Sequence, residues 1–351
     1  MKIFSIVGAR PQFIKLAPLS KALGDKHEQF IVHTGQHYDY LMSEKIFSDL
    51  EIRKPDVHLE TGPGSHAKQT GEMMLKLEEA MIEKRPDIVI VFGDTNSTLA
   101  GVLAAAKLNI PIVHIEAGLR SYNKTMPEEI NRITADHLSQ YLFAPTQNAI
   151  KILKNEGLKK RTFLTGDIMV DTMKNNLNIA LKKSDIISAL QLENKTFHLL
   201  TLHRNYNVDN EQVLEYILQQ LGKLEDQIIF PIHPRTRKML IGSFTVPQNI
   251  RIVDPLGYLD FITLENFAEK IITDSGGVQK ESYILHKPCI TLRTETEWTE
   301  TVEEKWNLLI NPRDKNMAEK IAEFRQPNIQ KEVFGKNVTR KMVKIINEIT
   351  N

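Results

Sequence analysis

Short apolar runs rich in β-branched residues alternate with longer amphipathic stretches along almost the whole chain. Each short run has the length and composition of a buried strand, and each longer stretch has the periodicity of a helix. This alternation is typical of a parallel sheet with helices on both faces. In the first half, strands are predicted at Lys2–Val7, Gln29–Thr34, Asp87–Phe92, Pro111–Ile115, Tyr141–Ala144 and Thr162–Thr165.

A second series of strands begins after a helical, lysine-rich stretch at Asp167–Lys195. With 351 residues, the chain is long for one core and suits two domains. We therefore predict two doubly wound, Rossmann-like parallel-sheet domains, at residues 1–170 and 171–334. The second-series strands are Phe197–Leu202, Gln227–Ile232, Ile250–Val253, Lys270–Thr273, Cys289–Leu292 and Leu308–Ile310.

The closing segment, Asn337–Ile349, is amphipathic and should dock as a helix. We predict that residues 335–351 pack back on the first domain.

Composition mainly excludes classes of protein. The 45 basic and 44 acidic residues leave a net charge of +1, so nothing points to nucleic acid or a membrane surface. The apolar run at the N-terminus is too short for a signal peptide, and no stretch approaches a transmembrane helix. The single cysteine, Cys289, excludes an intrachain disulfide and a cysteine-built metal site. A cytoplasmic enzyme is the simplest expectation.

The segment Ile271–Glu281 predicts a strand, a glycine turn and a helix. Gly276 and Gly277 let the backbone approach a ligand closely, and a helix N-terminus favours an anion such as a diphosphate. Glu281 could accept hydrogen bonds from a ribose. The alternative is an ordinary turn that needs glycine for a positive φ.

Ligands of open α/β sheets bind beyond the carboxyl ends of the strands. Polar residues follow many of the predicted strands: Arg10, Lys15, Asp94, Glu116, Arg120, Glu128, Glu129, His203, His233 and Arg293. Their convergence on strand ends indicates an active site.

Each of these residues also has a structural explanation. Asp94 could be a helix N-cap, and Glu128 with Glu129 could simply complement a helix dipole. His203 could be a buried core histidine, and Arg10 and Lys15 could be solvated surface residues.

Several motifs together resemble the non-hydrolysing UDP-N-acetylglucosamine 2-epimerases, from Met1 to about Ile310. The resemblance implies a glycosyltransferase-B-like fold with two domains facing a cleft, a homodimer, and a reaction without NAD, another cofactor or a metal. The motifs are Gly8-Ala9-Arg10-Pro11-Gln12, His33-Thr34-Gly35-Gln36-His37, Gly93-Asp94-Thr95-Asn96, His114-Ile115-Glu116-Ala117-Gly118-Leu119-Arg120, Pro127-Glu128-Glu129-Ile130-Asn131-Arg132, His203-Arg204 and Thr273-Asp274-Ser275-Gly276-Gly277.

C2 of UDP-GlcNAc has no adjacent carbonyl, so direct deprotonation there is inaccessible without an oxidation. The chain has no Gly-x-Gly-x-x-Gly dinucleotide fingerprint. Elimination of UDP to a glycal, followed by re-addition, avoids the problem and needs carboxylates and anion-stabilising groups.

The resemblance assigns roles to individual residues. Asp94, Glu116 and Glu128 would be the acid/base carboxylates, and His203 would lie by the diphosphate or assist protonation. For substrate binding, Arg10 with Ser275, Gly276 and Gly277 would hold phosphate, Glu281 the ribose, and further contacts are predicted from Lys15, Arg120, His233 and Arg293.

Three segments depart from the GlcNAc pattern and look more like enzymes that epimerise UDP-2,3-diacetamido-2,3-dideoxyglucuronate. They are His203-Arg204-Asn205-Tyr206, Ile232-His233-Pro234-Arg235 and Thr296-Glu297-Trp298-Thr299-Glu300. UDP-GlcNAc is the favoured substrate and this glucuronate the alternative, with Arg235, Arg237 and Arg293 as the cations available for its carboxylate. A UDP-sugar glycosyltransferase and an inactive nucleotide-sugar sensor are the rival classes.

Overall fold

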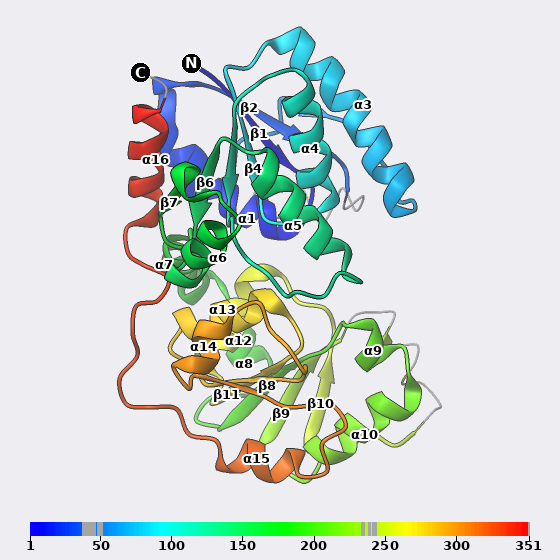
Figure 1. Ribbon diagram of the computed structural model, residues 1–351. Helices are drawn as coiled ribbons and strands as arrows, with labels where there is room; N and C mark the ends of the chain where they lie inside the picture. Colours follow the sequence, from blue (N-terminus) through cyan, green and yellow to red (C-terminus); the bar gives the residue numbers. More distant parts are fainter. Residues whose placement is uncertain (37–46, 48–51, 233–235, 238–239, 241–243, 350–351) are drawn as a thin grey trace. The chain divides into compact units, whose positions relative to one another are not determined.

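The computed structural model describes residues 1–36, 47, 52–232, 236–237, 240 and 244–349. The chain folds into two compact units: unit 1 is Met1–Thr172 with Glu332–Asn351, and unit 2 is Met173–Lys331. Figure 1 follows the chain through both units. In the described ranges, none of the helices is both long and apolar enough to cross a membrane.

Unit 1 contains a parallel sheet with the strand order β3-β2-β1-β4-β5-β6-β7. All its paired strands run parallel, so each connection crosses over through the helical layers. The order reverses between β1 and β4, which is the switch point where such sheets bind ligands. The strands are β1 (Lys2–Val7), β2 (Glu28–His33), β3 (Val57–His58), β4 (Ile88–Phe92), β5 (Ile112–Ile115), β6 (Tyr141–Ala144) and β7 (Thr162–Leu164).

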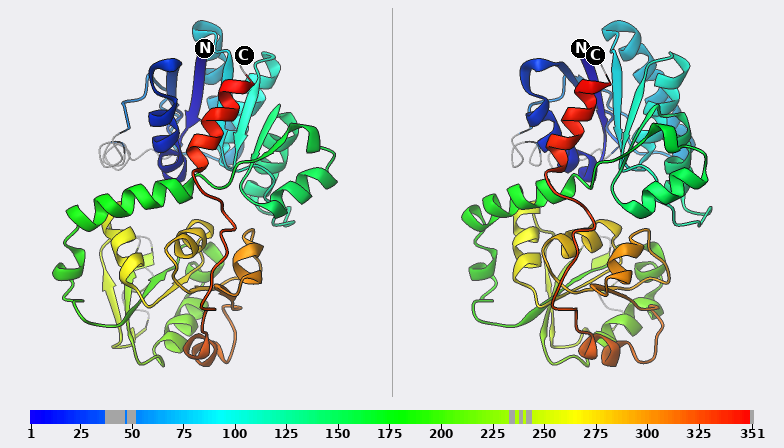
Figure 2. Two further views of the ribbon diagram at one scale, coloured as in Figure 1. Left: turned by 90° about the vertical axis from the view of Figure 1, so that its left-hand side faces the viewer. Right: turned by 60° about the vertical axis from the view of Figure 1, so that its left-hand side comes forward.

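Helices cover both faces of the unit 1 sheet. On one face, α3 (His66–Lys84), α4 (Asn96–Lys107) and α5 (Pro127–Leu138) pack on β1 and β4 through a continuous apolar cluster. On the other face, α1 (Arg10–Leu23) lies beside α16 (Val338–Glu348), as both views of Figure 2 show. The C-terminal helix therefore packs in unit 1 against α1, and His27 and Asn347 hydrogen bond at 2.7 Å. The other described helices of unit 1 are η1 (Gly24–Lys26), α6 (Gln147–Asn155) and η2 (Lys159–Arg161), and α7 (Met169–Lys183) begins in unit 1 and continues into unit 2.

Unit 2 contains a second parallel sheet with the order β10-β9-β8-β11-β12-β13. Its strands are β8 (Phe197–Thr201), β9 (Gln227–Pro231), β10 (Ile250–Val253), β11 (Lys270–Thr273), β12 (Cys289–Thr291) and β13 (Asn307–Leu309). Its helices are α8 (Ile186–Ala189), α9 (Asn205–Val208), α10 (Glu211–Leu221), α12 (Tyr258–Phe267), α13 (Gly276–Ile284), α14 (Thr299–Glu303) and α15 (Met317–Glu323).

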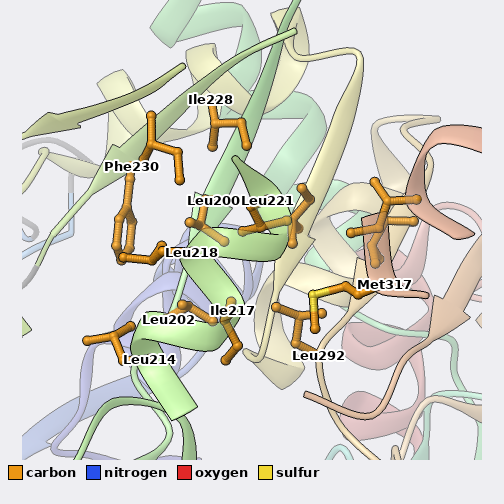
Figure 3. Packing of buried hydrophobic residues seen from close by; sticks show 14 of the residues in the cluster. Leu200, Leu202, Leu214, Ile217, Leu218, Leu221, Ile228, Phe230, Leu292 and Met317 are labelled. Carbon is orange, nitrogen blue, oxygen red and sulfur yellow. The ribbon is translucent and has the colours of Figure 1, made fainter. Parts of the chain in front are cut away.

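The core of unit 2 explains why its strands carry apolar residues on both faces. Leu200 points to one face of β8, where α10 and α15 pack (Figure 3), and Leu199 points to the other, where α8, α12 and α13 pack. Because successive side chains of a strand alternate between faces, a sheet covered on both sides needs apolar residues at every position. This is the pattern that the short apolar runs of the sequence predicted.

The predicted fold class, two doubly wound parallel-sheet domains, is confirmed. Every predicted strand is present, and its ends differ by no more than one residue. The sequence prediction missed β3, which has two residues at the sheet edge and is too short to show a periodic pattern.

Candidate active site

The carboxyl ends of β4 and β5 bring two predicted catalytic acids into one neighbourhood. Asp94 follows β4 after Gly93, and Glu116 follows β5 directly. The Gly93 N–H donates to Ile115 O at 2.9 Å, which joins the two strand ends. A Cβ placed on Gly93 would lie 3.2 Å from Glu116 Oε2, so the backbone beside Asp94 runs along the Glu116 carboxylate.

Glu116 has an unusual backbone and a buried partner. Its φ is +73°, a left-handed conformation that typically costs roughly 1–3 kcal/mol in a residue other than glycine and clusters at functional sites. Its carboxylate forms an ion pair with Lys15 Nζ, and both side chains are almost fully buried. The alternative that Lys15 is a solvated surface residue is therefore wrong.

Asp94 is not the cap of α4. Thr95 is the N-cap, and its side-chain oxygen accepts from Thr98 N–H at 3.3 Å. The Asp94 side chain is 32% exposed and pairs with buried Arg132 of α5, while Asn131 donates to Asp94 O at 2.9 Å. The N-cap explanation of Asp94 is wrong, and its carboxylate is held in place while keeping access to solvent.

Glu128 and Glu129 have different environments in the first turn of α5. Glu129 is buried and accepts from Ser121 N–H and Tyr122 N–H, both at 2.9 Å, and from Arg132 Nη1 at 3.0 Å. It therefore fixes the loop before α5. Glu128 is half-buried. Of the two, Glu128 is the one with a side chain left accessible, as its predicted role requires.

Arg120 lies in a buried charged network. Its guanidinium pairs with Asp136 at 2.7 Å and with Glu156 at 2.6 Å, and the side chain is almost inaccessible to solvent. Burial by itself lowers the pKa of Arg120, but hydrogen bonds and charge attraction from Glu156 and Asp136 raise it above its usual value. This geometry favours a structural role for Arg120, and its contact with substrate stays a prediction.

Gln12 is a residue whose role the sequence analysis missed. Its Oε1 accepts from Gly8 N–H at 2.8 Å, and its Nε2 donates to Phe92 O at 2.9 Å. It thereby ties the end of β1 to the end of β4. The only hint in the sequence was its position two residues after Arg10, which is half-buried at the start of α1.

In unit 2, Asp274 organises the loop that carries His203. It is fully buried and accepts from His203 N–H, Arg204 N–H and Asn207 Nδ2, each at 3.0 Å. Burial by itself raises the pKa of Asp274, but the hydrogen bonds from His203, Asn207 and Arg204 lower it below its usual value.

His203 is half-exposed, at 52% of its side chain, and its Nδ1 lies 3.1 Å from Asp274 Oδ1. The alternative of a buried core histidine is wrong. A carboxylate behind one ring nitrogen fixes the orientation of the imidazole, an arrangement that recurs where a histidine exchanges protons.

The glycine segment of unit 2 differs from the predicted turn. α13 begins at Gly276, and neither Gly276 nor Gly277 has a positive φ, so the turn explanation is wrong. A Cβ on Gly276 would lie 2.2 Å from Glu297 Oε1, whereas at Gly277 the nearest described atom would be Ser275 Oγ at 3.8 Å. Gly276 therefore serves packing, and the start of the helix stays open at Gly277. Glu281 is buried further along α13.

Two of the predicted cations of unit 2, Arg293 and Arg237, are in ion pairs. Arg293 is buried and lies 3.1 Å from Glu297, and Arg237 lies 2.7 Å from Asp254 at the surface. His233 and Arg235 lie outside the described residues. In the part of the chain that the structure describes, no three His, Cys, Asp or Glu side chains form a group that could hold a metal ion.

Comparison with known proteins agrees with these motifs. A family model described as UDP-N-acetylglucosamine 2-epimerase matches residues 21–347. A UDP-N-acetylglucosamine 2-epimerase homolog of Methanococcus maripaludis is 50% identical over 92% of both chains. A UDP-2,3-diacetamido-2,3-dideoxy-D-glucuronate 2-epimerase of Pseudomonas aeruginosa is 44% identical over 88% of both.

A solved structure has the same fold. The crystal structure of Methanocaldococcus jannaschii UDP-GlcNAc 2-epimerase in complex with UDP-GlcNAc and UDP matches with a TM-score of 0.90 and 40% identity, over 100% of this chain and 99% of that one. The resemblance drawn from the motifs is confirmed. Sequence, fold and the matched family model agree that this chain belongs to the UDP-N-acetylglucosamine 2-epimerase family of isomerases.

Proposed function

We propose that the protein epimerises UDP-GlcNAc at C2 to UDP-ManNAc without hydrolysing it. One observation carries the proposal: this chain places Asp94 and Glu116 at the ends of adjacent strands. A buried cation, Arg132 or Lys15, fixes each carboxylate. Such fixed carboxylates suit proton transfer at a carbon whose proton is only weakly acidic.

The proposed reaction proceeds by elimination and re-addition. A carboxylate takes the C2 proton while the C1–O bond to UDP breaks. The electron pair of the C1–O bond leaves with the diphosphate. The glycal then receives a proton at C2 from the opposite face, and UDP adds back at C1. Asp94, Glu116 and Glu128 carry the proton transfers and stabilise the oxocarbenium character at C1. The role of base is assigned to this set of three acids and not to one member.

The residues of unit 2 are proposed to bind and stabilise UDP. At the start of α13, the Ser275 hydroxyl and the N–H groups of Gly276 and Gly277 favour a diphosphate, and Glu281 accepts from the ribose. His203, oriented by Asp274, stabilises or protonates the leaving group. Arg10 is assigned to phosphate at the start of α1, and Lys15 to the positioning of Glu116.

UDP-GlcNAc is preferred over the diacetamido-glucuronate, whose carboxylate needs a cation that no acid neutralises. Of the cations predicted for that carboxylate, Arg293 and Arg237 each pair with an acid, and Arg235 lies outside the described residues. Sequence identity does not discriminate between the two substrates, because a relative named for the glucuronate is 44% identical to this chain.

Incubation with each UDP-sugar in D2O tests the proposal. The epimerase exchanges one deuterium into C2 and yields a mixture of the two epimers, whereas a glycosyltransferase at most releases UDP and a sensor changes nothing. A kcat/KM for the diacetamido-glucuronate about tenfold above that for UDP-GlcNAc, a difference of about 1.4 kcal/mol, would overturn the substrate and leave the mechanism intact.

We also propose a homodimer in the cytoplasm. Leu75 and Ile82, spaced seven residues apart on one face of α3, are 62% and 59% exposed, and neighbouring large apolar side chains at a surface mark interfaces. Light scattering during gel filtration should give twice the chain mass, and the double variant Leu75→Glu/Ile82→Glu should give one chain mass. Leu181→Glu, at an exposed leucine of α7, is the control. A monomeric wild type would contradict the dimer.

A further inference from the structure

A buried histidine and aspartate connect the two turns that carry Asp94 and Glu116. His114 lies in β5 and Asp136 in α5, and both are fully buried. His114 Nδ1 lies 2.7 Å from Asp136 Oδ1, and His114 Nε2 lies 2.8 Å from Gly93 O. The second carboxylate oxygen of Asp136 accepts from Gly118 N–H at 3.0 Å. The pair thus contacts the turn after β4 at one end and the turn after β5 at the other.

Both turns contain residues with a left-handed backbone conformation. Gly93 has a φ of +62°, Glu116 of +73° and Gly118 of +84°. Left-handed residues persist only where the surroundings determine them, and for Glu116 the conformation is costly because of its Cβ. The Gly93 carbonyl and the Gly118 N–H are the two backbone groups held by the pair.

The hydrogen-bonding partners indicate which atoms of the pair donate and which accept. A carbonyl oxygen only accepts, so His114 Nε2 donates to Gly93 O. Burial by itself raises the pKa of Asp136, but hydrogen bonding and charge attraction from His114 and Arg120 lower it below its usual value, so Asp136 accepts as a carboxylate. His114 Nδ1 faces this carboxylate at 2.7 Å, so each ring nitrogen of His114 has a fixed partner.

We propose that His114 and Asp136 are positioning residues that hold the turns of Asp94 and Glu116 in the geometry that C2 epimerisation requires. The inference rests on the proposed function. The pair contacts no reacting atom in this assignment and acts only through the backbone of Gly93 and Gly118. It explains why two polar side chains are completely buried beneath these two turns, where apolar residues would pack at lower cost.

The test uses His114→Gln and Asp136→Asn in the full chain, with a matched control in unit 2. His198 is also buried in a strand and lies 3.4 Å from Asp226, but it is the second residue of β8, away from the carboxyl end of the strand. Epimerisation kinetics, deuterium incorporation at C2, UDP binding by calorimetry and thermal unfolding are measured for each variant.

Each variant of the pair should lower kcat by about 100-fold, the effect of displacing a reacting group by about 1 Å, while UDP affinity stays within about twofold. The double variant should lose little more than either single one, because both residues act through one contact chain. His198→Gln should match their loss of thermal stability and keep its kcat.

A folded His114→Gln or Asp136→Asn variant with a kcat within about threefold of the His198→Gln control would overturn the proposal, as would a loss confined to KM. If neither variant folds, nitrogen-15 NMR of the wild type decides, because a His114 Nε2 without a proton contradicts the hydrogen bond to Gly93 O. A wild type that incorporates no deuterium at C2 would instead refute the proposed function.

Discussion

Both units have an aspartate at the equivalent position of a similar sheet, but the two aspartates differ in burial and in hydrogen-bonding partners. β4 of unit 1 and β11 of unit 2 each lie next to the first strand of their unit, at the point where the strand order reverses. Asp94 follows β4, is one-third exposed and pairs with the Arg132 side chain. Asp274 follows β11, is completely buried and accepts two backbone N–H groups and the Asn207 amide.

The difference shows that partners, not position, decide what a strand-end acid does. Backbone donors consume the hydrogen-bonding capacity of Asp274 and make it a structural anchor for His203. A side-chain cation leaves Asp94 accessible. In the proposed reaction, unit 1 supplies acids for proton transfer, and unit 2 supplies an oriented histidine and the N–H groups of α13.

The strongest test of the contrast is Asp94→Asn. Folding should survive because Thr95 caps α4, but turnover should fall by about 100- to 10 000-fold, the range for loss of an acid/base group. Deuterium exchange into C2 measures it. Asp87→Asn, just before the other end of β4, is the control and should exchange normally. An Asp94→Asn variant with near wild-type exchange would remove Asp94 from the chemistry.

The second test concerns the anion site of unit 2. Gly277→Val should weaken UDP binding by about 10- to 100-fold, because charge-assisted hydrogen bonds to phosphate are worth roughly 1.5–3 kcal/mol and a side chain there blocks them. Calorimetry with UDP measures the loss. Gly276→Val is a poorer test, because its side chain would also displace Glu297.

Gly71→Val is the control for the loss of helix propensity. Gly71 lies in α3, and a Cβ there would meet no described atom within 4 Å. Unchanged UDP affinity in a folded Gly277→Val protein would exclude the start of α13 as the diphosphate site.

The third test addresses Asp274 as an anchor. Asp274→Asn should destabilise the protein by roughly 1–3 kcal/mol at neutral pH, because buried donors lose a charged acceptor. The pKa of Asp274 is lowered in the folded state, so its stabilisation is present above its unfolded pKa of about 3.9 and is lost as the pH falls below that value. Urea unfolding at several pH values should show that the difference in unfolding free energy between variant and wild type becomes smaller in acid. A difference that becomes larger in acid would contradict the assignment.

The smallest effect is expected at Arg237. Its ion pair with Asp254 is exposed, so Arg237→Ala should change stability by less than about 1 kcal/mol. It should also leave the preference between UDP-GlcNAc and the diacetamido-glucuronate unchanged. Competitive kinetics with both sugars measures this preference, and a tenfold shift would show that Arg237 contacts the sugar.

The sequence predicted the local elements well because their causes are local. Strand runs such as Lys2–Val7 are mostly apolar, and Asn337–Ile349 carries an amphipathic stripe, so each could be identified from its own residues. The motifs likewise identified the family. The two-residue strand β3 carries too little pattern to be found.

The environment of each candidate residue could not be predicted in this way. The sequence left Asp94 between a cap and an acid, His203 between the core and the site, and Lys15 between the surface and the substrate. The structure excludes the cap, the core and the solvated surface through partners 38, 71 and 101 residues away in sequence, namely Arg132, Asp274 and Glu116.

The sequence by itself thus determined the parallel α/β architecture, the family and the set of polar residues at strand ends. Only the tertiary structure decided which of these residues are buried anchors, as Asp274 and Asp136 are, and which stay accessible, as Asp94 and His203 do. The physical reason is that periodicity reports which face of an element is buried, whereas the behaviour of a charge depends on the donors and charges that distant segments place around it.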